Sequence, residues 1–135
     1  MDDCVFCKII AGKIPAHKVY ENDKIFAFLD NNPIHAGHTL VVPRAHHADL
    51  LETPDDVLSD MITRTKKIAT AVMKAVKADG FNLGCNTKPA AGQAVFHTHF
   101  HIIPRFSNDG LKPWPHQKID AAAMEKVRDA IKAAL

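Results

Sequence analysis

Residues 97–105 read HTHFHIIPR, a run in which three histidines alternate with other side chains and then give way to apolar residues. Successive side chains of a β-strand point to opposite faces of a sheet. A strand over residues 94–104 therefore places the three histidines on one face, and Thr98, Phe100 and Ile102 on the other, toward a core. The stretch predicts a sheet with one chemically active face and one buried face.

The element predicted to cover that core is a long amphipathic helix. Residues 53–56, TPDD, combine a capping residue, a proline suited to the first helical position and acidic residues in the first turn. Apolar residues then recur three and four apart as far as Val76, which is typical of a helix with one buried face. We expect this helix to end at Gly80, because glycine adopts the left-handed conformation of a C-cap without strain.

Shorter elements complete the predicted fold. A terminal helix begins at Asp120, and its apolar residues again recur three or four apart. Residue type and turn signals predict a short helix at 4–12, two strands around a turn at 21–23, and further strands at 38–43 and 81–87. Together these elements indicate an α+β fold: an antiparallel sheet of about five strands, covered by one long helix, with short N-terminal and C-terminal helices.

The composition is that of one ordinary globular domain. The 135 residues are 47% hydrophobic and 24% charged, and the formal net charge of +2 is too small to indicate nucleic-acid binding. No run approaches the ~20 apolar residues that a membrane span needs. The first residues, MDDCVFCKII, lack the basic-then-apolar layout of a signal peptide. We therefore expect a cytoplasmic protein with neither nucleic-acid nor membrane partners.

Three alternating histidines are hard to explain by packing, because buried polar groups are rarely left unpaired. One interpretation makes all three zinc ligands, as in three-histidine catalytic sites. The other makes one imidazole a nucleophile, while its neighbours orient it and bind an anion. The ordinary histidine pKa of about 6.5 allows the neutral form that a nucleophile needs. The residues alone leave both interpretations open.

Two stretches resemble the histidine triad (HIT) superfamily, and in particular its bacterial HIT and HINT-like nucleotide hydrolases. Residues 97–103 fit the pattern His-x-His-x-His followed by apolar residues, and residues 33–46, PIHAGHTLVVPRAH, fit P-x-x-x-G-H-x-L-x-x-P-x-x-H. The likeness runs from about Cys4 to Arg105. We therefore expect a HIT domain at 4–110 and a C-terminal extension with a terminal helix at 111–135.

The resemblance implies chemistry at the α-phosphate of a purine nucleotide. By this likeness His99 attacks phosphorus and forms a nucleotidyl-histidine intermediate. Water then releases the nucleoside monophosphate from His99. The implied substrates are adenosine phosphoramidates, AMP conjugates or dinucleoside polyphosphates. His101 is expected to donate to a phosphate oxygen, and His38 to do the same or to hold His99 in place.

The resemblance also implies where the nucleotide binds. Asp30 matches the acid that accepts hydrogen bonds from ribose hydroxyls, although by residue type alone it is equally a turn residue. An apolar slot for the base is expected from Ile10, Phe26 and Leu29.

The phosphate is expected to meet uncharged donors. Asn86 and Gln93 offer side-chain amides, and backbone N–H groups around Gly92, Gln93 and Ala94 add to an anion site. Many relatives carry serine where this chain has Ala94, and that hydroxyl is held to assist the leaving group. The alanine predicts a substrate preference different from that of phosphoramidate-specialised relatives.

Cys4 and Cys7 form a CxxC pair. The resemblance implies that His46 and His97 join them as ligands of a closed structural zinc that the chemistry does not require. His47 is the alternative to His46, and two reduced thiols on a short helix are the alternative to zinc. This assignment gives the three histidines three roles: a metal ligand, a nucleophile and a phosphate contact.

Two other functions stay open. One is a nucleotide-binding regulatory module with little turnover, and the other is a metallohydrolase that uses all three histidines. The resemblance further implies a homodimer, joined by sheet edges or by the long helices. His17, His35 and His116 receive no role and are interpreted as exposed loop residues.

Overall fold

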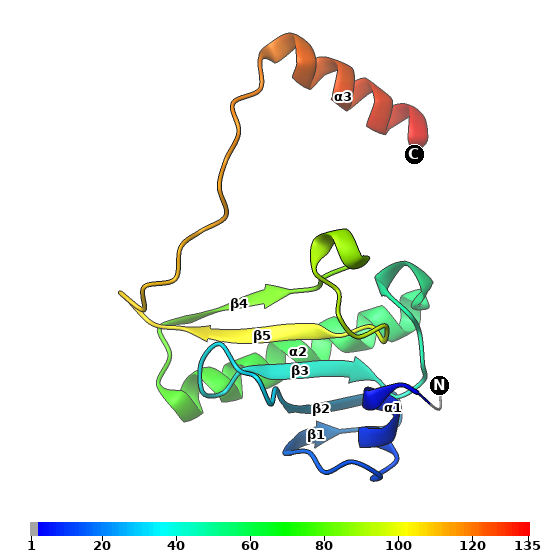
Figure 1. Ribbon diagram of the computed structural model, residues 1–135, viewed down its shortest axis with the longest axis vertical. Helices are drawn as coiled ribbons and strands as arrows, with labels where there is room; N and C mark the ends of the chain where they lie inside the picture. Colours follow the sequence, from blue (N-terminus) through cyan, green and yellow to red (C-terminus); the bar gives the residue numbers. More distant parts are fainter. Residues whose placement is uncertain (1–2) are drawn as a thin grey trace.

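The computed structural model describes residues 3–135 and is built around one five-stranded antiparallel sheet (Figure 1). The strand order is β1-β2-β3-β5-β4. The strands are β1 Lys18–Glu21, β2 Ile25–Leu29, β3 Thr39–Pro43, β4 Gly80–Gly84 and β5 Phe100–Arg105. The helices are α1 Val5–Ile10, α2 Asp55–Val76 and α3 Ala121–Ala134, with single 3-10 turns at Leu50–Glu52 and Pro89–Ala91. The predicted fold class is confirmed.

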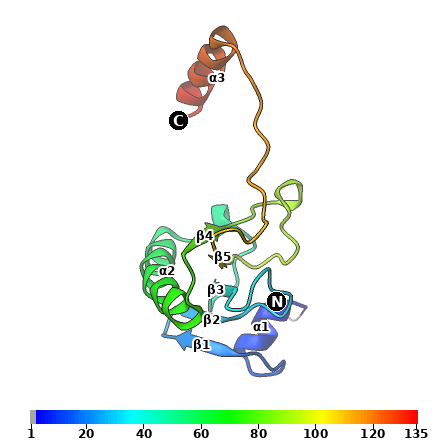
Figure 2. The ribbon, with the colours of Figure 1, turned by 90° about the vertical axis from the view of Figure 1, so that its left-hand side faces the viewer.

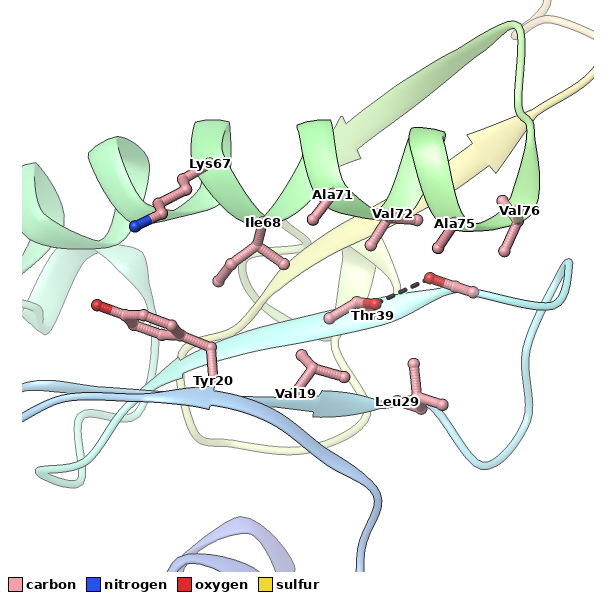
Figure 3. Close-up of a pocket in the computed structure, with 11 residues that line it drawn as sticks. Val19, Tyr20, Leu29, Thr39, Lys67, Ile68, Ala71, Val72, Ala75 and Val76 are labelled. Carbon is pink, nitrogen blue, oxygen red and sulfur yellow. Dashed lines mark hydrogen bonds between the residues drawn. The ribbon is translucent and has the colours of Figure 1, made fainter.

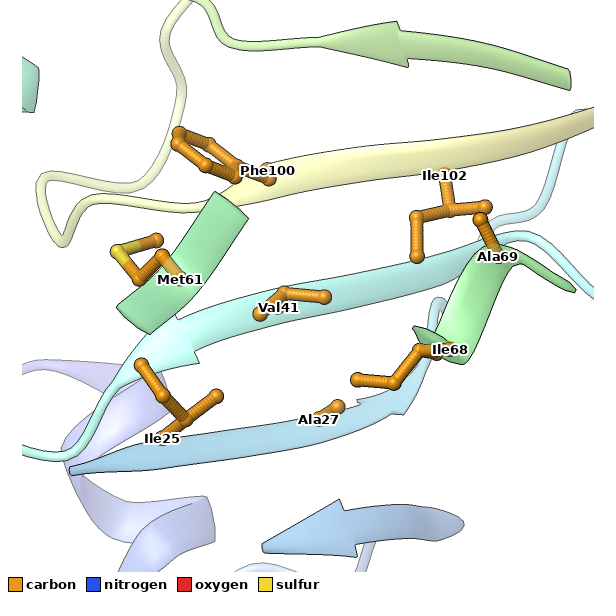
Figure 4. Packing of buried hydrophobic residues seen from close by; sticks show 8 residues of the cluster. All are labelled: Ile25, Ala27, Val41, Met61, Ile68, Ala69, Phe100 and Ile102. Atoms are coloured by element: carbon orange, nitrogen blue, oxygen red, sulfur yellow. The ribbon is translucent and has the colours of Figure 1, made fainter. Parts of the chain in front are cut away.

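Each face of the sheet carries its own apolar cluster. Ile25 and Ala27 of β2 point toward α2, where they join Phe100 and Ile102 of β5, as Figure 4 shows. The alternate residues of β2 point toward α1 and pack with Phe6. The prediction that Phe100 and Ile102 face the core under the long helix is confirmed. The histidines, which alternate with these residues, consequently lie on the α1 face.

Both predicted ends of the long helix need correction. The Thr53 hydroxyl does not cap the helix, because it donates to the Asp49 carbonyl (2.8 Å) and also bonds the Thr98 hydroxyl (2.7 Å). At the other end Lys77, rather than Gly80, adopts the left-handed conformation with φ of 57°. Gly80 instead opens β4, because it already pairs with Arg105 of β5.

The histidine strand is shorter than predicted. Strand β5 begins only at Phe100, so residues 94–99 precede it as irregular chain. Here the backbone leaves the ladder and bonds to the loop that follows β3: the Thr98 N–H donates to the His47 carbonyl over 2.8 Å. The strand predicted at 81–87 likewise ends at Gly84.

Helix α3 stands apart from the sheet at the end of an extended segment, as Figures 1 and 2 show. Its predicted start is confirmed, because the Asp120 carboxylate accepts the Ala123 N–H over 2.8 Å. Its apolar residues Met124, Val127 and Ile131 are each more than half exposed. Within residues 3–135, no helix is both long enough and apolar enough to cross a membrane.

An apolar groove of about 430 Å³ runs between α2 and the β1 side of the sheet (Figure 3). Val72 and Val76 line it from α2, and Val19 and Leu29 line it from the strands. The groove opens on the α2 face, which is the face opposite the histidines.

Candidate active site and metal centre

Four side chains that the sequence spreads over more than 90 positions meet at one end of the sheet. Cys4 and Cys7 come from the start of α1, His46 from the loop after β3, and His97 from the chain before β5. One ligand atom of each lies within 4.8 Å of all the others. His47 stays outside this group, so His46 is the histidine that the fold places beside the cysteines.

The spacing of these atoms fits tetrahedral zinc. Zinc bonds of about 2.3 Å to sulfur and about 2.05 Å to nitrogen, at the tetrahedral angle, place S and N about 3.6 Å apart. The Cys4 Sγ lies 3.4 Å from His97 Nδ1, and the Cys7 Sγ lies 3.4 Å from His46 Nδ1 and 3.6 Å from His97 Nδ1. The donor set and its spacing therefore suit a closed Cys₂His₂ site.

A hydrogen bond orients His97 for this role. Its Nε2–H donates to the Pro43 carbonyl oxygen over 2.7 Å. Because a carbonyl only accepts, the proton of the neutral ring is on Nε2, and the Nδ1 lone pair faces the two thiols. Burial lowers the pKa of His97 to about 4, so the ring is neutral at pH 7. Ligating histidines are commonly fixed in this way through the nitrogen that does not bind the metal.

His99 has the opposite tautomer. Its Nδ1–H donates to the backbone carbonyl of His97 over 2.7 Å, which leaves a lone pair on Nε2. The side chain is only 7% exposed, and burial lowers the pKa of His99, which favours the neutral ring. The Phe6 ring packs nearly perpendicular to the His99 ring, with ring centres 5.1 Å apart. His99 is thus a fixed, neutral imidazole with one free basic nitrogen.

His38 and His101 form a hydrogen-bonded relay beside His99. The Ile34 N–H donates to His38 Nδ1 over 3.1 Å, so neutral His38 holds its proton on Nε2. That Nε2–H donates to His101 Nδ1 over 2.9 Å, which leaves the His101 proton on Nε2. Burial lowers the pKa of both rings, that of His101 to about 4. His101 therefore presents an N–H donor while both rings stay neutral.

The same tautomers argue against a second metal site. Donor atoms of Asp30, His38 and His101 also lie within 4.8 Å of one another. However, His38 Nδ1 accepts the Ile34 N–H, so its Nε2 keeps a proton and has no lone pair for a metal. The Asp30 carboxylate lies 3.5 Å from this Nε2 and supports the protonated nitrogen. This group is a relay of hydrogen bonds.

The structure overturns the expected role of Gln93. Its side chain is buried, and its amide is fully used within the chain. Oε1 accepts the Lys88 N–H over 2.8 Å, and Nε2 donates to the carbonyls of Ala48 (2.7 Å) and Val95 (3.2 Å). Gln93 therefore ties the 88–95 loop to the chain after β3 and offers no amide donor to a phosphate.

Asn86 and Gly92 lie close together. Gly92 has φ of +92°, and a Cβ placed there would come within 3.4 Å of Asn86 Nδ2. Glycine thus allows the loop to pass close to the amide. Asn86 also lines a cavity of about 620 Å³ together with His38 and His101, and Trp114 lines the same cavity. Ala94 lines a separate pocket beside Cys4 and His46.

Of the residues expected to form the slot for the base, Ile10 and Phe26 lie together, but Leu29 does not join them. Leu29 lies in the groove on the α2 face, whereas Ile10 and Phe26 belong to the cluster on the α1 face. The cationic groups of Lys18 and Arg44 lie about 6 Å from the Phe26 ring, at 6.0 and 5.8 Å. Leu29 is corrected because strand residues alternate between faces, and this register sends it toward α2.

Two aromatic residues that the sequence reasoning missed form the apolar wall near His99. Phe6 packs edge-on against Phe28 with ring centres 5.4 Å apart, and it also contacts His99. Phe28 stands two residues before Asp30 and therefore shares its side of the strand. Counting back from Asp30 in twos would have found it.

The arrangement of one covering helix, one five-stranded sheet and three histidines from a single segment defines the class of protein that the sequence resembles. A family model described as the HIT domain matches residues 11–108, most of the chain. The chain therefore belongs to the HIT domain family.

Relatives extend across nearly the whole chain. A protein named adenylylsulfatase HINT3 from Arabidopsis thaliana is 43% identical over 96% of this chain, which spans 64% of that protein's length. A protein named adenosine 5′-monophosphoramidase HNT1 from Candida albicans is 39% identical over 98% of this chain and 91% of its own length.

Solved structures agree with the fold. The crystal structure of a Streptococcus mutans UA159 protein has a TM-score of 0.93 at 41% identity and covers 99% of this chain and 86% of that one. A zinc-bound histidine triad family protein from Mycobacterium smegmatis has a TM-score of 0.79 at 36% identity, with coverage of 96% and 98%.

Proposed function

We propose that this protein is a nucleotide hydrolase that attacks the α-phosphate of AMP conjugates through His99. The observation that carries the proposal is the hydrogen bond from His99 Nδ1 to the His97 carbonyl, which holds the opposite nitrogen unprotonated at neutral pH. The names of the Arabidopsis and Candida relatives support hydrolysis of an adenylyl bond to sulfate or to an amine. The proposed substrates are adenosine phosphoramidates, other AMP conjugates and dinucleoside polyphosphates.

The proposed reaction has two displacements. The lone pair on His99 Nε2 forms a bond to phosphorus, and the bond from phosphorus to the leaving group breaks, with its electrons leaving on that group. Water then attacks phosphorus and loses a proton to solvent, which balances the proton that the departing group takes up. The P–N bond breaks with its electron pair returning to His99 Nε2, and AMP leaves. The His101 Nε2–H stabilises the negative charge that builds on a non-bridging oxygen in each step. The Asn86 amide and the Ala94 N–H are proposed as further donors, whereas the N–H groups of Gly92 and Gln93 already donate to the carbonyls of Pro89 (2.9 Å) and Lys88 (3.3 Å).

The nucleoside is proposed to lie on the α1 side of the histidines. Asp30 is partly exposed, and one of its oxygens already accepts the Asn32 N–H over 2.9 Å. A carboxylate oxygen can accept more than one hydrogen bond, so Asp30 still has capacity for ribose hydroxyls. Phe6 and Phe28 belong to the same apolar cluster as Ile10 and Phe26, and this cluster is proposed as the wall for the base, without the Leu29 predicted from the sequence.

Cys4, Cys7, His46 and His97 are proposed to hold a structural zinc. The metal would neutralise two thiolates and fasten α1 to the histidine segment, with no open position for water. This assignment removes His97 from catalysis and argues against the metallohydrolase interpretation, which needs all three histidines on one ion.

A homodimer is also proposed. Strand β4 is an edge of the sheet, and an unpaired edge is normally covered. Phe81 and Leu83 on β4 and Ile62 on α2 are all more than one-third exposed, and they line one apolar pocket of about 430 Å³. A second copy that pairs along β4 would bury these side chains. Residues 4–110 are proposed as the HIT domain and 111–135 as the extension.

Intact-protein mass spectrometry during turnover of an adenosine phosphoramidate tests the proposed function. We expect the wild-type protein to gain a transient AMP adduct, and His99→Asn to show neither adduct nor turnover. His116→Asn is the matched control, because it makes the same change at an exposed histidine in the segment that leads to α3. AMP binding by a wild-type protein without adduct or turnover would favour the regulatory module instead.

A further inference from the structure

Asp109 gathers an unusual number of hydrogen bonds just after the last strand. Arg105 donates to both of its oxygens, over 2.7 and 3.0 Å. The N–H groups of Phe106 and Leu111 donate to it as well, each over 3.1 Å. The Asp109 side chain is only 6% exposed, so these donors hold it rigidly at the base of the C-terminal segment.

His35 joins this carboxylate from a different part of the chain. Its Nε2 lies 3.2 Å from Asp109 Oδ2, and its ring packs perpendicular to Phe106 with centres 5.4 Å apart. His35 is therefore no free loop histidine, contrary to the expectation from the sequence. Because Arg105 also donates to Asn82 of β4 over 2.6 Å, the carboxylate is anchored to both final strands.

His35 begins the turn of residues 35–38, which leads to His38, the first histidine of the relay. His35 closes this turn by accepting the His38 N–H on its carbonyl over 3.0 Å. The neighbouring Ile34 N–H is the group that fixes the His38 tautomer. Ile34 itself is half exposed, so its side chain contributes little to holding that N–H in position.

We propose that Asp109 and His35 form a clasp that positions the Ile34 N–H, and thereby keeps His101 as a hydrogen-bond donor to the phosphate. Both are positioning residues, since neither is proposed to touch substrate. The inference rests on the proposed function for its link to turnover, but not for its effect on the relay. Without the clasp, His38 can take its proton on Nδ1, and His101 would then present a lone pair to the phosphate oxygens.

Two variants and one control test the clasp. His35→Phe keeps a ring against Phe106 and removes the hydrogen bond to Asp109, whereas His35→Gln restores a donor. Asp79→Asn is the control, because Asp79 accepts the Ser107 N–H over 2.7 Å in the same loop but does not touch the turn. The readouts are the ¹⁵N shifts of the His38 and His101 rings in the full-length zinc-loaded protein, and kcat for an adenosine phosphoramidate.

We expect His35→Phe to give mixed His38 tautomers and about a tenfold lower kcat, a fraction of the ~100-fold that loss of a whole oxyanion donor costs. His35→Gln should recover much of both, and Asp79→Asn should leave both unchanged. An unchanged tautomer in His35→Phe, or a shifted tautomer with wild-type kcat, contradicts the proposal. If the wild-type protein shows no turnover, the proposed function fails, and the tautomer alone decides on the clasp.

Discussion

Replacing Gln93 by alanine tests how the loop beside the histidines is held. The substitution removes three hydrogen bonds at a side chain that is 5% exposed. A neutral hydrogen bond contributes about 1 kcal/mol net, so the expected loss of unfolding free energy is about 3 kcal/mol. The Lys88 N–H and the Ala48 carbonyl lose their partner, and the 88–95 loop should detach from the chain after β3.

Gln93→Glu sharpens this test. The variant keeps the size of the side chain, but a carboxylate cannot donate to the Ala48 and Val95 carbonyls and places charge against both oxygens. We expect it to be less stable than Gln93→Ala at pH 7 and to recover partly in acid, where a neutral carboxyl group can again donate one hydrogen bond.

Urea denaturation followed by circular dichroism measures both effects. With an m-value of about 1.5 kcal/mol/M, a loss of about 3 kcal/mol lowers the midpoint by about 2 M. Gln117→Ala is the matched control, because Gln117 is exposed. A midpoint for Gln93→Ala equal to that of the control would refute the claim that this amide anchors the loop.

The remaining predictions concern the metal group and the relay. Chelating zinc should lower the unfolding free energy by about 4 kcal/mol relative to protein at free zinc of about 1,000 times Kd, with turnover largely retained below the melting temperature. Thermal melts with zinc analysis check this result: Cys7→Ser should melt like the chelated protein and Cys85→Ser should not. For His101, the folded-state pKa of about 4 lies below the ordinary 6.5, so the unfolded chain binds more protons between these values. Its contribution to stability is thus present above pH 6.5 and is lost as pH falls toward 4. His101→Asn should melt with a weaker pH dependence than the wild-type protein across this window, and equal slopes would count against the assignment.

The fold was predictable because local periodicity sets which side chains share a face. The alternation after His97 separated Phe100 and Ile102 from the histidines without knowledge of the other strands. It could not reveal that residues 94–99 leave the sheet, because their partners are carbonyls of Pro43 and His47, which only tertiary structure brings near. The left-handed residue at Lys77 was hidden for a similar reason: the pairing of Gly80 with Arg105 decides where the helix must stop.

Some residues of the candidate site could likewise be predicted from the sequence, and others could not. Residue types and the family pattern identified the histidines and cysteines, and the structure brings them together as two groups. The prediction that the Gln93 amide binds phosphate was wrong. An amide can bond a phosphate or backbone groups equally well, and only the structure shows that its partners are backbone groups. Leu29 was placed on the wrong face and Phe28 was missed because the register of β2 was not counted from Asp30. Phe6 lies in α1, and only the packing of that helix on the sheet brings it to His99. The role of His35 could not be read from a loop with no periodicity.

Both ring nitrogens of His97 have a partner: Nδ1 contacts the Cys4 thiol, and Nε2 donates to the Pro43 carbonyl. The backbone carbonyl of the same residue accepts the Nδ1–H of His99 and so orients that ring. Because His97 has these two independent contacts, the orientation of His99 does not depend on the cysteines alone. Loss of the cysteines would leave the bond from His97 to Pro43 in place. If the proposed zinc is present, the chain could therefore gain or lose it by mutation without passing through a form in which His99 has lost its orientation.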